Sequence, residues 1–446
     1  MSARPTSGAQ AGRSDARTAP PNDRTRRQFL GDSLVGLGAL GAGLAARGGT
    51  AESGSVGTRA ASGTTGPIGA PRIRSRRPLG RTGLEIPDIA MGTFSLDQGE
   101  ALVHHALERG ITHFDTAESY ADGRAEEVLG RALRGRRDGV TLTSKYSAAP
   151  NDSAERQMAV LERSLRRLGT ETIDVYLNHA VNDVERLDSP AWQSFVERAK
   201  RQGKIRFAGL SGHAGRLTEC LAHGLDTGLL DVVLVAYHFA QTPSYQQDVK
   251  RYLAGLSASF DFVSPQPGLP ALLERAHAAG VGVMVMKTLR GARLNDMRPF
   301  ESPGRTFAQA AFRWVLSERA VDGLVVSMTS RAMIDEYVEA SGSGPPDRED
   351  LALLARYESR HARTTCTIGC GDCLAACPAG VPIPDVMRTR MYAEDYGLPR
   401  TAAREYARLP VDATACLACS GEPCHDACPV GLPIDRLNRA THRRLA

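Results

Sequence analysis

Eight short apolar runs alternate with longer helical patterns over residues 73–341, and this alternation restricts the fold more than any other feature of the chain. Each run has the length and β-branched content of a buried strand, and a segment with helical periodicity follows it, as in 152–168. Eight strand–helix repeats over a segment of this size predict a (β/α)8 barrel, an α/β fold. The expected strands are 88–91, 112–116, 140–145, 173–177, 205–211, 231–237, 281–287 and 323–328.

A doubly wound sheet is the competing α/β fold, but no G-x-G-x-x-G follows the first expected strand. In a barrel, chemistry belongs to the C-terminal ends of the strands. Four polar residues are expected at that rim: Asp115 ends the second strand, Tyr120 follows it, Lys145 ends the third strand and His179 follows the fourth. The sequence therefore predicts that these four side chains converge.

This set of residues suits proton transfer to a carbonyl oxygen. The Lys145 ammonium would lower the pKa of the Tyr120 phenol from about 10, and Asp115 would hold the ammonium in place. Tyr120 would then donate its proton to a developing alkoxide, while His179 orients the carbonyl. Each residue alone also has a purely structural explanation, as a helix cap, a rim residue, a surface charge or a core imidazole. Four such residues at adjacent strand ends favour the catalytic interpretation.

Segments 114–120, 143–145 and 174–179, together with 78–83, resemble the aldo/keto reductase family. The resemblance extends over about residues 77–341. It implies a (β/α)8 barrel that reduces an aldehyde or ketone, a small-molecule carbonyl substrate, with NADP or NAD. It also implies a catalytic tetrad and a set of coenzyme contacts. The tetrad is Asp115, Tyr120, Lys145 and His179, and the coenzyme contacts are Ser211, Met286, Ser330, Arg331 and Glu336.

The expected coenzyme site departs from the family pattern at four positions, one of which is the absence of the expected Gln from the sixth strand, at 233–235. Gly212 replaces the usual Asn, and Met286 stands where an aromatic ring normally stacks on the nicotinamide. Met333 stands where a basic residue is expected, although Arg331 lies close to it in sequence. A thioether can pack on a flat ring, so the nicotinamide coenzyme stays the prediction.

Eight of the nine cysteines lie between residues 366 and 428, in two motifs that each end in Cys-Pro. This pattern is typical of bacterial ferredoxins, in which the fourth Cys of each motif serves the other cluster. It predicts two [4Fe–4S] clusters in a small α-helical ferredoxin-like domain over 349–446. Two zinc sites or four disulfides are the alternatives. One predicted cluster has Cys366, Cys370, Cys373 and Cys428 as ligands, and the other has Cys377, Cys416, Cys419 and Cys424.

The N-terminal tail carries the basic character of the chain. Residues 1–80 hold 12 Arg and 4 acidic residues, a net charge of +8, whereas the whole chain has +5. The remainder is therefore near −3, which argues against a nucleic-acid partner. Residues 26–30 resemble a twin-arginine motif ahead of a weakly apolar stretch. We expect an export signal over 1–51, a flexible linker over 52–72 and passage through the twin-arginine translocase to the periplasm or cell envelope. A basic tail on a cytoplasmic protein is the alternative.

Three functions agree with these features. The first is a nicotinamide-dependent reductase of aldehydes or ketones, which would oxidise an alcohol in the reverse direction, with an accessory iron–sulfur module. The second is an iron–sulfur protein whose barrel docks an electron-transfer partner. The third is an exported oxidoreductase that uses the tetrad without a nucleotide.

Overall fold

The computed structural model of the 446-residue chain describes residues 69–94, 96, 99–181, 183–213, 216–239, 268–290, 294–361, 366, 371–394, 399–407 and 409–446. The predicted export signal at 1–51, the linker up to residue 68 and Cys370 lie outside the described residues. None of the described helices combines the length and the apolarity that crossing a bilayer requires.

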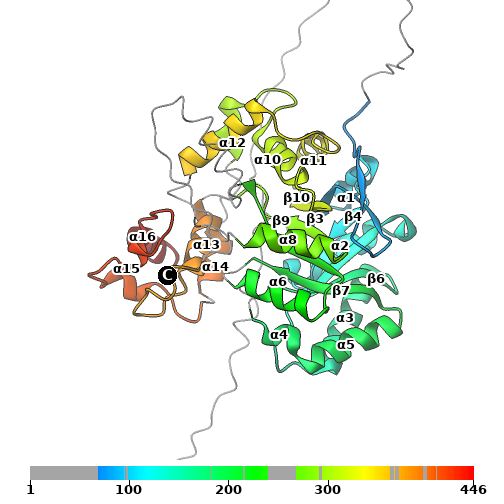
Figure 1. The fold of residues 1–446 in the computed structure, drawn as a ribbon, viewed down its shortest axis with the longest axis horizontal. Helices are drawn as coiled ribbons and strands as arrows, with labels where there is room; N and C mark the ends of the chain where they lie inside the picture. The colour runs from blue at the N-terminus through cyan, green and yellow to red at the C-terminus, as the bar shows by residue number, and fades with distance from the viewer. Residues whose placement is uncertain are drawn as a thin grey trace, which may run out of the picture.

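Eight parallel strands close into a barrel, in which each strand pairs with the next along the chain and the last pairs with the first (Figure 1). This closure confirms the predicted (β/α)8 barrel and excludes the doubly wound sheet, which is open. Each strand begins and ends within one residue of its predicted limits. The barrel strands are β3 (Ile89–Gly92), β4 (His113–Asp115), β5 (Thr141–Tyr146), β6 (Ile173–Asn178), β7 (Ile205–Gly212), β8 (Val232–Ala236), β9 (Gly282–Met286) and β10 (Gly323–Ser327).

A hairpin of β1 (Arg76–Pro78) and β2 (Glu85–Pro87) covers the N-terminal end of the barrel. Its Leu79 and Ile86 are completely buried and pack with the interior side chains of the strands. Gly80, with φ +49°, approaches the start of β9 so closely that a Cβ there would lie 2.4 Å from the Gly282 nitrogen. Because this end is filled, the C-terminal rim is the end of the barrel at which a site can form.

Helices surround the strands and bury the second, larger part of the core. Local sequence sets several of their ends: the Ser153 hydroxyl caps α3 and Gly169 ends it, while Thr306 and Gln309 form a capping box on α10. The barrel helices are α1 (Glu100–Glu108), α2 (Arg124–Ala132), α3 (Ala154–Leu168), α4 (Glu185–Asp188), α5 (Pro190–Arg201), α6 (Leu217–Asp226), α8 (Leu269–Ala278), α9 (Leu294–Met297), α10 (Phe307–Leu316) and α11 (Arg331–Val338), with the 3-10 helices η2 (Tyr120–Gly123), η3 (Arg137–Gly139) and η5 (Arg298–Phe300).

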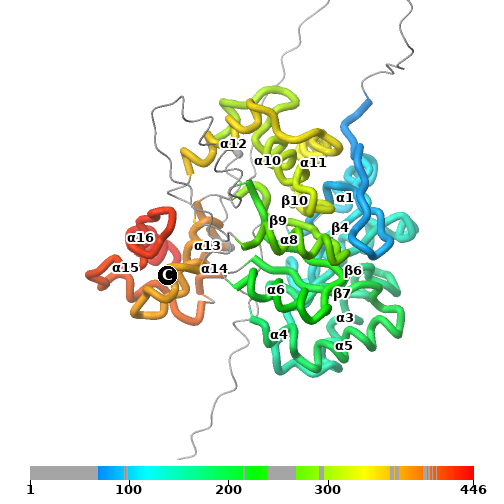
Figure 2. Tube along the Cα trace, viewed as in Figure 1, coloured from blue at the N-terminus to red at the C-terminus, as the bar shows by residue number. Residues whose placement is uncertain are grey.

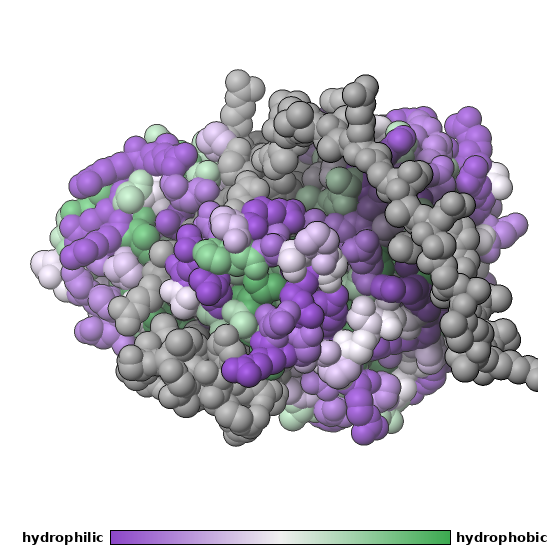
Figure 3. Space-filling model, turned by 90° about the horizontal axis from the view of Figure 1, so that it is seen from above, coloured by the Kyte–Doolittle hydropathy of each residue, from purple (hydrophilic) through white to green (hydrophobic). Residues whose placement is uncertain are grey.

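The longer described elements after the barrel are all helices. Helix α12 lies beside α10, and the remaining helices gather in a lobe next to the barrel, drawn in orange and red in Figure 2. One face of the molecule is covered mostly by hydrophilic side chains, with small hydrophobic areas between them (Figure 3). These elements are α12 (Arg348–His361), α13 (Ile383–Glu394), α14 (Pro399–Tyr406), η6 (Thr414–Leu417), α15 (Pro423–Asp426) and α16 (Ile434–Leu445).

Candidate active site

The C-terminal ends of three neighbouring strands supply the predicted tetrad. Asp115 is the last residue of β4, Lys145 is the penultimate residue of β5, and His179 directly follows β6. Tyr120 begins η2, in the loop after β4. Because the strands are parallel and paired in this order, their ends meet on one rim, and the structure brings the four side chains together as predicted.

The Lys145 ammonium is the centre of this group. Its Nζ donates to Asp115 Oδ1 at 2.6 Å and to the backbone oxygen of Thr116 at 2.7 Å. The Tyr120 hydroxyl lies 3.5 Å from the same nitrogen. Lys145 and Asp115 are only 1 % and 3 % exposed, so neither charge is solvated by bulk water. The ammonium therefore links the carboxylate to the phenol through direct contacts.

The Tyr120 ring is half-buried between two other rings. Phe94 contacts it edge to face with 5.2 Å between centroids, and the His179 imidazole lies 5.9 Å away in a similar orientation. This packing places the imidazole beside the phenol at the mouth of the barrel. A carbonyl oxygen that reaches Tyr120 would therefore also meet His179.

The backbone around Tyr120 is unusual and is supported from α3. The next residues, Ala121, Asp122 and Gly123, have φ of 50°, 58° and 93°, and a left-handed conformation costs a non-glycine residue about 1–2 kcal/mol. Arg167 donates to the backbone oxygen of Glu118 at 3.0 Å, and a Cβ at Gly123 would lie 2.2 Å from its guanidinium carbon. Arg167 therefore packs against the turn that positions Tyr120.

Burial dominates the electrostatics of the pair. It raises the pKa of Asp115 and lowers the pKa of Lys145, while the contact between the two opposes both shifts. Burial also raises the pKa of Tyr120 well above its usual value of 10, and the Asp115 carboxylate adds to this shift. The sequence predicts that Lys145 lowers the pKa of Tyr120; the pKa is raised instead, because burial of the phenol is the largest effect and the Asp115 carboxylate adds to it. The phenol consequently keeps its proton and can act as a proton donor.

The His179 imidazole is neutral. Burial lowers its pKa well below the usual 6.5, and the nearby positive charges of Lys145 and Arg186 lower it further. A neutral imidazole offers one N–H donor and one acceptor. His179 can therefore donate a hydrogen bond to a substrate oxygen while adding no positive charge to the site.

Arg186 on α4 holds the backbone around His179, and the sequence pattern did not reveal it. Its guanidinium donates to the backbone oxygens of Ala148, His179 and Ala180 at 2.7, 2.8 and 2.8 Å, and to Asn178 Oδ1 at 2.7 Å. Ala180 has φ +53°, so the chain turns sharply directly after the imidazole. Helix α4 has only four residues, too few to show a helical pattern in the sequence, so no sequence pattern indicated this role of Arg186.

The expected nicotinamide contacts lie at the ends of β7 and β9. Ser211 is completely buried near the end of β7, and its Oγ accepts a hydrogen bond from the Ala180 amide at 3.1 Å. Met286 is the last residue of β9 and is partly exposed. Its backbone oxygen accepts from the Tyr237 amide at 3.0 Å. Both residues therefore lie on the same rim as the tetrad.

The expected adenine-end contacts lie on α11. The Ser330 hydroxyl caps this helix by accepting from the Met333 amide at 3.2 Å. Arg331 is exposed in its first turn. Glu336 is already paired with Arg298, whose Nη2 lies 3.2 Å from Glu336 Oε2. The structure thus leaves Arg331 accessible, while Glu336 has a partner within the protein.

Residues 80–257 match the Aldo/keto reductase family. L-glyceraldehyde 3-phosphate reductase from Escherichia coli O157:H7 is 26 % identical over 325 residues, which cover 63 % of this chain and 91 % of the relative. L-galactose dehydrogenase from Arabidopsis thaliana is 26 % identical over 286 residues, with coverage of 59 % and 87 %. The holo form of an aldo-keto reductase from Bacillus halodurans, a solved structure, is 21 % identical with a TM-score of 0.48 and covers 63 % of this chain and 95 % of that one.

The barrel contains an aldo/keto reductase family domain over residues 80–257, which include strands β3 to β8. Both curated relatives are oxidoreductases by name, and the alignments with this chain cover most of their sequences. The match includes the four tetrad positions and Ser211 but ends before the eight cysteines of the two motifs.

The loop after β9 contains a second unusual backbone segment of the barrel. Lys287 and Arg290 have φ of 61° and 45°, and their side chains are 7 % and 4 % exposed. The Arg290 guanidinium pairs with Glu358 of α12. Burial lowers the pKa of Lys287 well below its usual value, and the positive charge of Arg388 adds to this shift. The sequence analysis missed the segment because left-handed backbone at a Lys or Arg leaves no mark in the residue pattern.

The cysteines after the aldo/keto reductase domain fall into two spatial groups. Cys366, Cys373 and Cys428 line one cavity, together with apolar side chains such as Ile383 and Met387. Burial raises the pKa of the Cys416 and Cys424 thiols, and neighbouring thiols add to both shifts: Cys377 and Cys419 at Cys416, and Cys416 and Cys377 at Cys424. The described cysteines form no disulfides, which argues against the four-disulfide alternative for this part of the chain.

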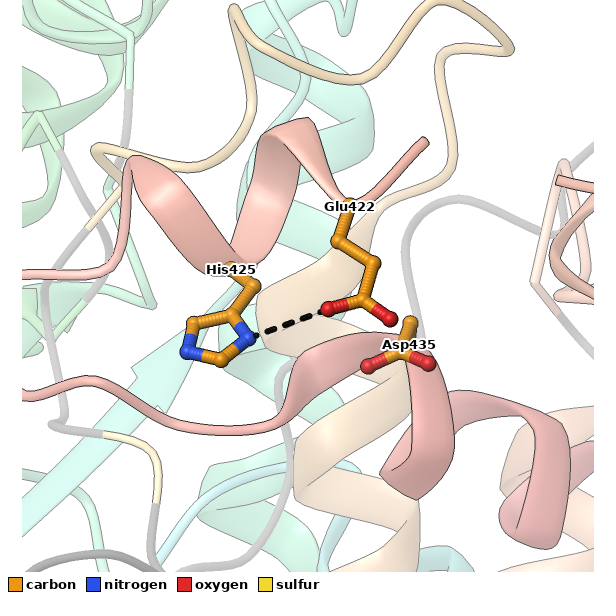
Figure 4. Close-up of side chains that lie close together, drawn as sticks. All are labelled: Glu422, His425 and Asp435. Atoms are coloured by element: carbon orange, nitrogen blue, oxygen red, sulfur yellow. Dashed lines mark ion pairs between the residues drawn. The ribbon is translucent and has the colours of Figure 1, made fainter. Parts of the chain in front are cut away.

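Three polar side chains near the second group lie close together (Figure 4). Glu422 and His425 of the α15 region face Asp435 of α16, and one ligand atom of each lies within 4.8 Å of the others. His425 Nδ1 is 3.4 Å from Glu422 Oε2, and Arg439 Nε is 3.9 Å from Asp435 Oδ2. The guanidinium supplies a positive charge to the buried carboxylate, and we assign no ion to this group.

The Arg186 contacts lead to a prediction about stability. In Arg186→Lys a single ammonium cannot reach all of the acceptors that the guanidinium fork reaches. We expect the free energy of unfolding to fall by about 2–4 kcal/mol, as measured by urea denaturation. The control is Arg198→Lys, an exposed arginine 3.7 Å from Glu155, which should change stability by less than about 0.5 kcal/mol. Equal effects of the two changes would contradict the proposed role of Arg186.

Proposed function

We propose that this protein reduces an aldehyde or ketone to an alcohol with a nicotinamide coenzyme, and carries an iron–sulfur module as an accessory. The contact of Lys145 Nζ with both Asp115 and the Tyr120 hydroxyl, at 2.6 and 3.5 Å, carries the proposal. It places a protonated phenol on a buried ammonium at the active rim of an aldo/keto reductase domain. The names of the relatives support an oxidoreductase, and the substrate class is inferred from the site.

Each tetrad residue has a separate task in the proposed reaction. Tyr120 donates its proton to the carbonyl oxygen as negative charge develops there. The Lys145 ammonium stabilises the phenolate that forms, and Asp115 keeps the ammonium in place. The neutral His179 donates a hydrogen bond that orients the carbonyl. When bound, the nicotinamide supplies the hydride, and the phenolate later regains a proton from water.

The residues present fit a nicotinamide coenzyme at two separate places. Met286 is partly exposed at the end of β9, and its polarisable thioether can pack on a flat ring. Arg331 is exposed at the start of α11, where a guanidinium can bind a phosphate. The Ser211 hydroxyl accepts from Ala180 and retains its own hydrogen for a carboxamide. Arg331 makes NADP the better candidate, and NAD remains the second.

The thiols fit two [4Fe–4S] clusters. Cys366, Cys373 and Cys428 share a cavity with apolar walls, and the Leu432 amide donates to Cys428 Sγ at 3.4 Å. The Asn438 amide contacts Cys416 Sγ at 3.7 Å, and such hydrogen bonds to sulfur favour the thiolate. The two groups combine cysteines of both motifs in the way that the ferredoxin rule predicts. We assign Cys370 to the first cluster from its place in the motif. When bound, the clusters supply single-electron transfer, and an electron-transfer partner would exchange these electrons.

We also propose export by the twin-arginine route. The proposal is supported by Arg26-Arg27 ahead of a stretch rich in Leu, Ala and Gly. This route carries folded proteins, which allows clusters to be inserted before transport.

Tyr120→Phe tests the proposed acid. The change removes one hydroxyl, and we expect kcat for carbonyl reduction to fall by about 10²–10⁴-fold while the dissociation constant for NADP is unchanged. Steady-state kinetics and a fluorescence titration measure the two quantities. The control is Tyr176→Phe on β6, a buried hydroxyl with no hydrogen-bond partner among the described residues, which should keep full activity.

Retention of the rate in Tyr120→Phe would refute the role of the tetrad. Failure of the wild-type protein to bind either NADP or NAD would instead favour the nucleotide-independent oxidoreductase or the iron–sulfur protein that docks a partner.

Metal analysis of anaerobically purified protein tests the clusters. Two [4Fe–4S] clusters require about eight iron and eight sulfide per chain. Cys428→Ser should reduce both values toward about four, because it removes a ligand of one cluster. Cys220→Ser on α6 is the control, since this cysteine is buried in the barrel core and should leave both values unchanged. Zinc in place of iron would refute the assignment.

Export is tested in the native cell. Replacing both Arg26 and Arg27 by Lys should retain the protein in the cytoplasm, as measured by fractionation, because the twin-arginine translocase reads this pair. The charge-conserving control, Arg13→Lys with Arg17→Lys, changes the same tail and should leave export intact. Equal export of both variants would argue against the twin-arginine route.

A further inference from the structure

The loop formed by residues 287–290 continues directly from Met286 on the active rim. Its two basic residues, Lys287 and Arg290, adopt left-handed backbone with φ of 61° and 45°, and the Arg290 amide donates to the Lys287 oxygen at 3.1 Å. Such conformations at non-glycine residues persist only where the surrounding structure holds them, and they cluster at ligand-binding loops. The question is therefore what holds this loop.

Helix α12 supplies two contacts to the loop, both at Arg290. The Tyr357 hydroxyl donates to the Arg290 backbone oxygen at 2.5 Å, and the Glu358 carboxylate pairs with the Arg290 guanidinium. All three side chains are almost completely buried. One contact fixes the backbone of the loop, and the other fixes the side chain, so α12 defines both the path and the direction of Arg290.

Tyr357 is itself fixed by barrel side chains. Its ring stacks on Phe307 of α10 with 4.3 Å between centroids and an interplanar angle of 12°, and Phe239, which follows β8, meets it edge to face at 6.2 Å. The hydroxyl therefore comes from a rigid position. Helix α12 follows the eighth strand–helix unit of the barrel and leads toward Cys366, the first cysteine of the cluster motifs.

We propose that Tyr357 and Glu358 of α12 are positioning residues for coenzyme binding: they hold residues 287–290 and thereby fix Met286, which is partly exposed at the rim, at the place where the coenzyme binds. This inference rests on the proposed nicotinamide function. It makes the helix that leads into the cysteine module a part of the coenzyme site. Displacement of α12 is then expected to weaken coenzyme binding without altering the tetrad.

The test uses the full-length protein and Tyr357→Phe, which keeps the stacked ring and removes one hydrogen bond. We expect the dissociation constant for NADP to rise about 3–10-fold, the effect of one lost hydrogen bond, with kcat at saturating NADP changed less than about twofold. Glu358→Gln, which leaves Arg290 buried without its partner charge, should weaken binding by more than Tyr357→Phe. Tyr337→Phe is the control, since this buried hydroxyl on α11 has no hydrogen-bond partner among the described residues.

A second readout is independent of the coenzyme. Hydrogen exchange of the peptide that contains residues 287–290 should be faster in ligand-free Tyr357→Phe than in the wild type or Tyr337→Phe. Unchanged exchange together with unchanged NADP affinity in Tyr357→Phe would overturn the inference, even if Glu358→Gln fails to fold. If the wild type binds neither NADP nor NAD, the proposed function fails, and the exchange measurement still decides whether α12 holds the loop.

Discussion

The buried ion pair of Lys145 and Asp115 is the interaction on which the rest of the site depends. Removing two such charges from water costs several kcal/mol per ion, and the pair is tolerable only if its geometry is accurate. That accuracy comes from strand register: Asp115 lies opposite Thr143, two residues before Lys145, so both side chains face the same side of the sheet. The barrel must close in this register before the phenol of Tyr120 has a cation beside it.

Around this rigid pair, the remaining site residues lie on loops that other elements hold. Arg167 of α3 packs against the turn of Tyr120, and Arg186 of α4 holds the turn of His179. Arg290 stands in the same relation to α12, although there the arginine lies in the loop and the helix supplies its partners. In all three places a buried or partly buried guanidinium contacts backbone or carboxylate oxygens near a left-handed residue. Strained loops on the barrel rim are thus held by arginine contacts between the loop and a surrounding helix.

The difference between site residues on strands and site residues on loops explains what the sequence could predict. The strands were predictable to within one residue, because a buried strand requires a short apolar run and the chain contains eight such runs. The tetrad was predictable because the C-terminal ends of parallel strands must meet. The pKa of Tyr120 was not, since its direction depends on how completely burial and Asp115 outweigh the ammonium. Arg186 and the contacts at Arg290 were also missed, because they join residues distant in sequence and leave no periodic pattern.

The cysteine groups extend this reasoning beyond the barrel. Cys428 of the second motif lines the cavity of Cys366 and Cys373, and Cys377 of the first motif lies beside Cys416. On the proposed cluster assignment each four-thiol site takes cysteines from both motifs, so the segment from 366 to 428 would fold as one unit around the clusters. Helix α12 is continuous with that unit in sequence and with the loop after β9 in space. On the proposed cluster assignment, a change of charge or ligation in the module would reach the rim through the position of α12, which contacts Arg290 directly.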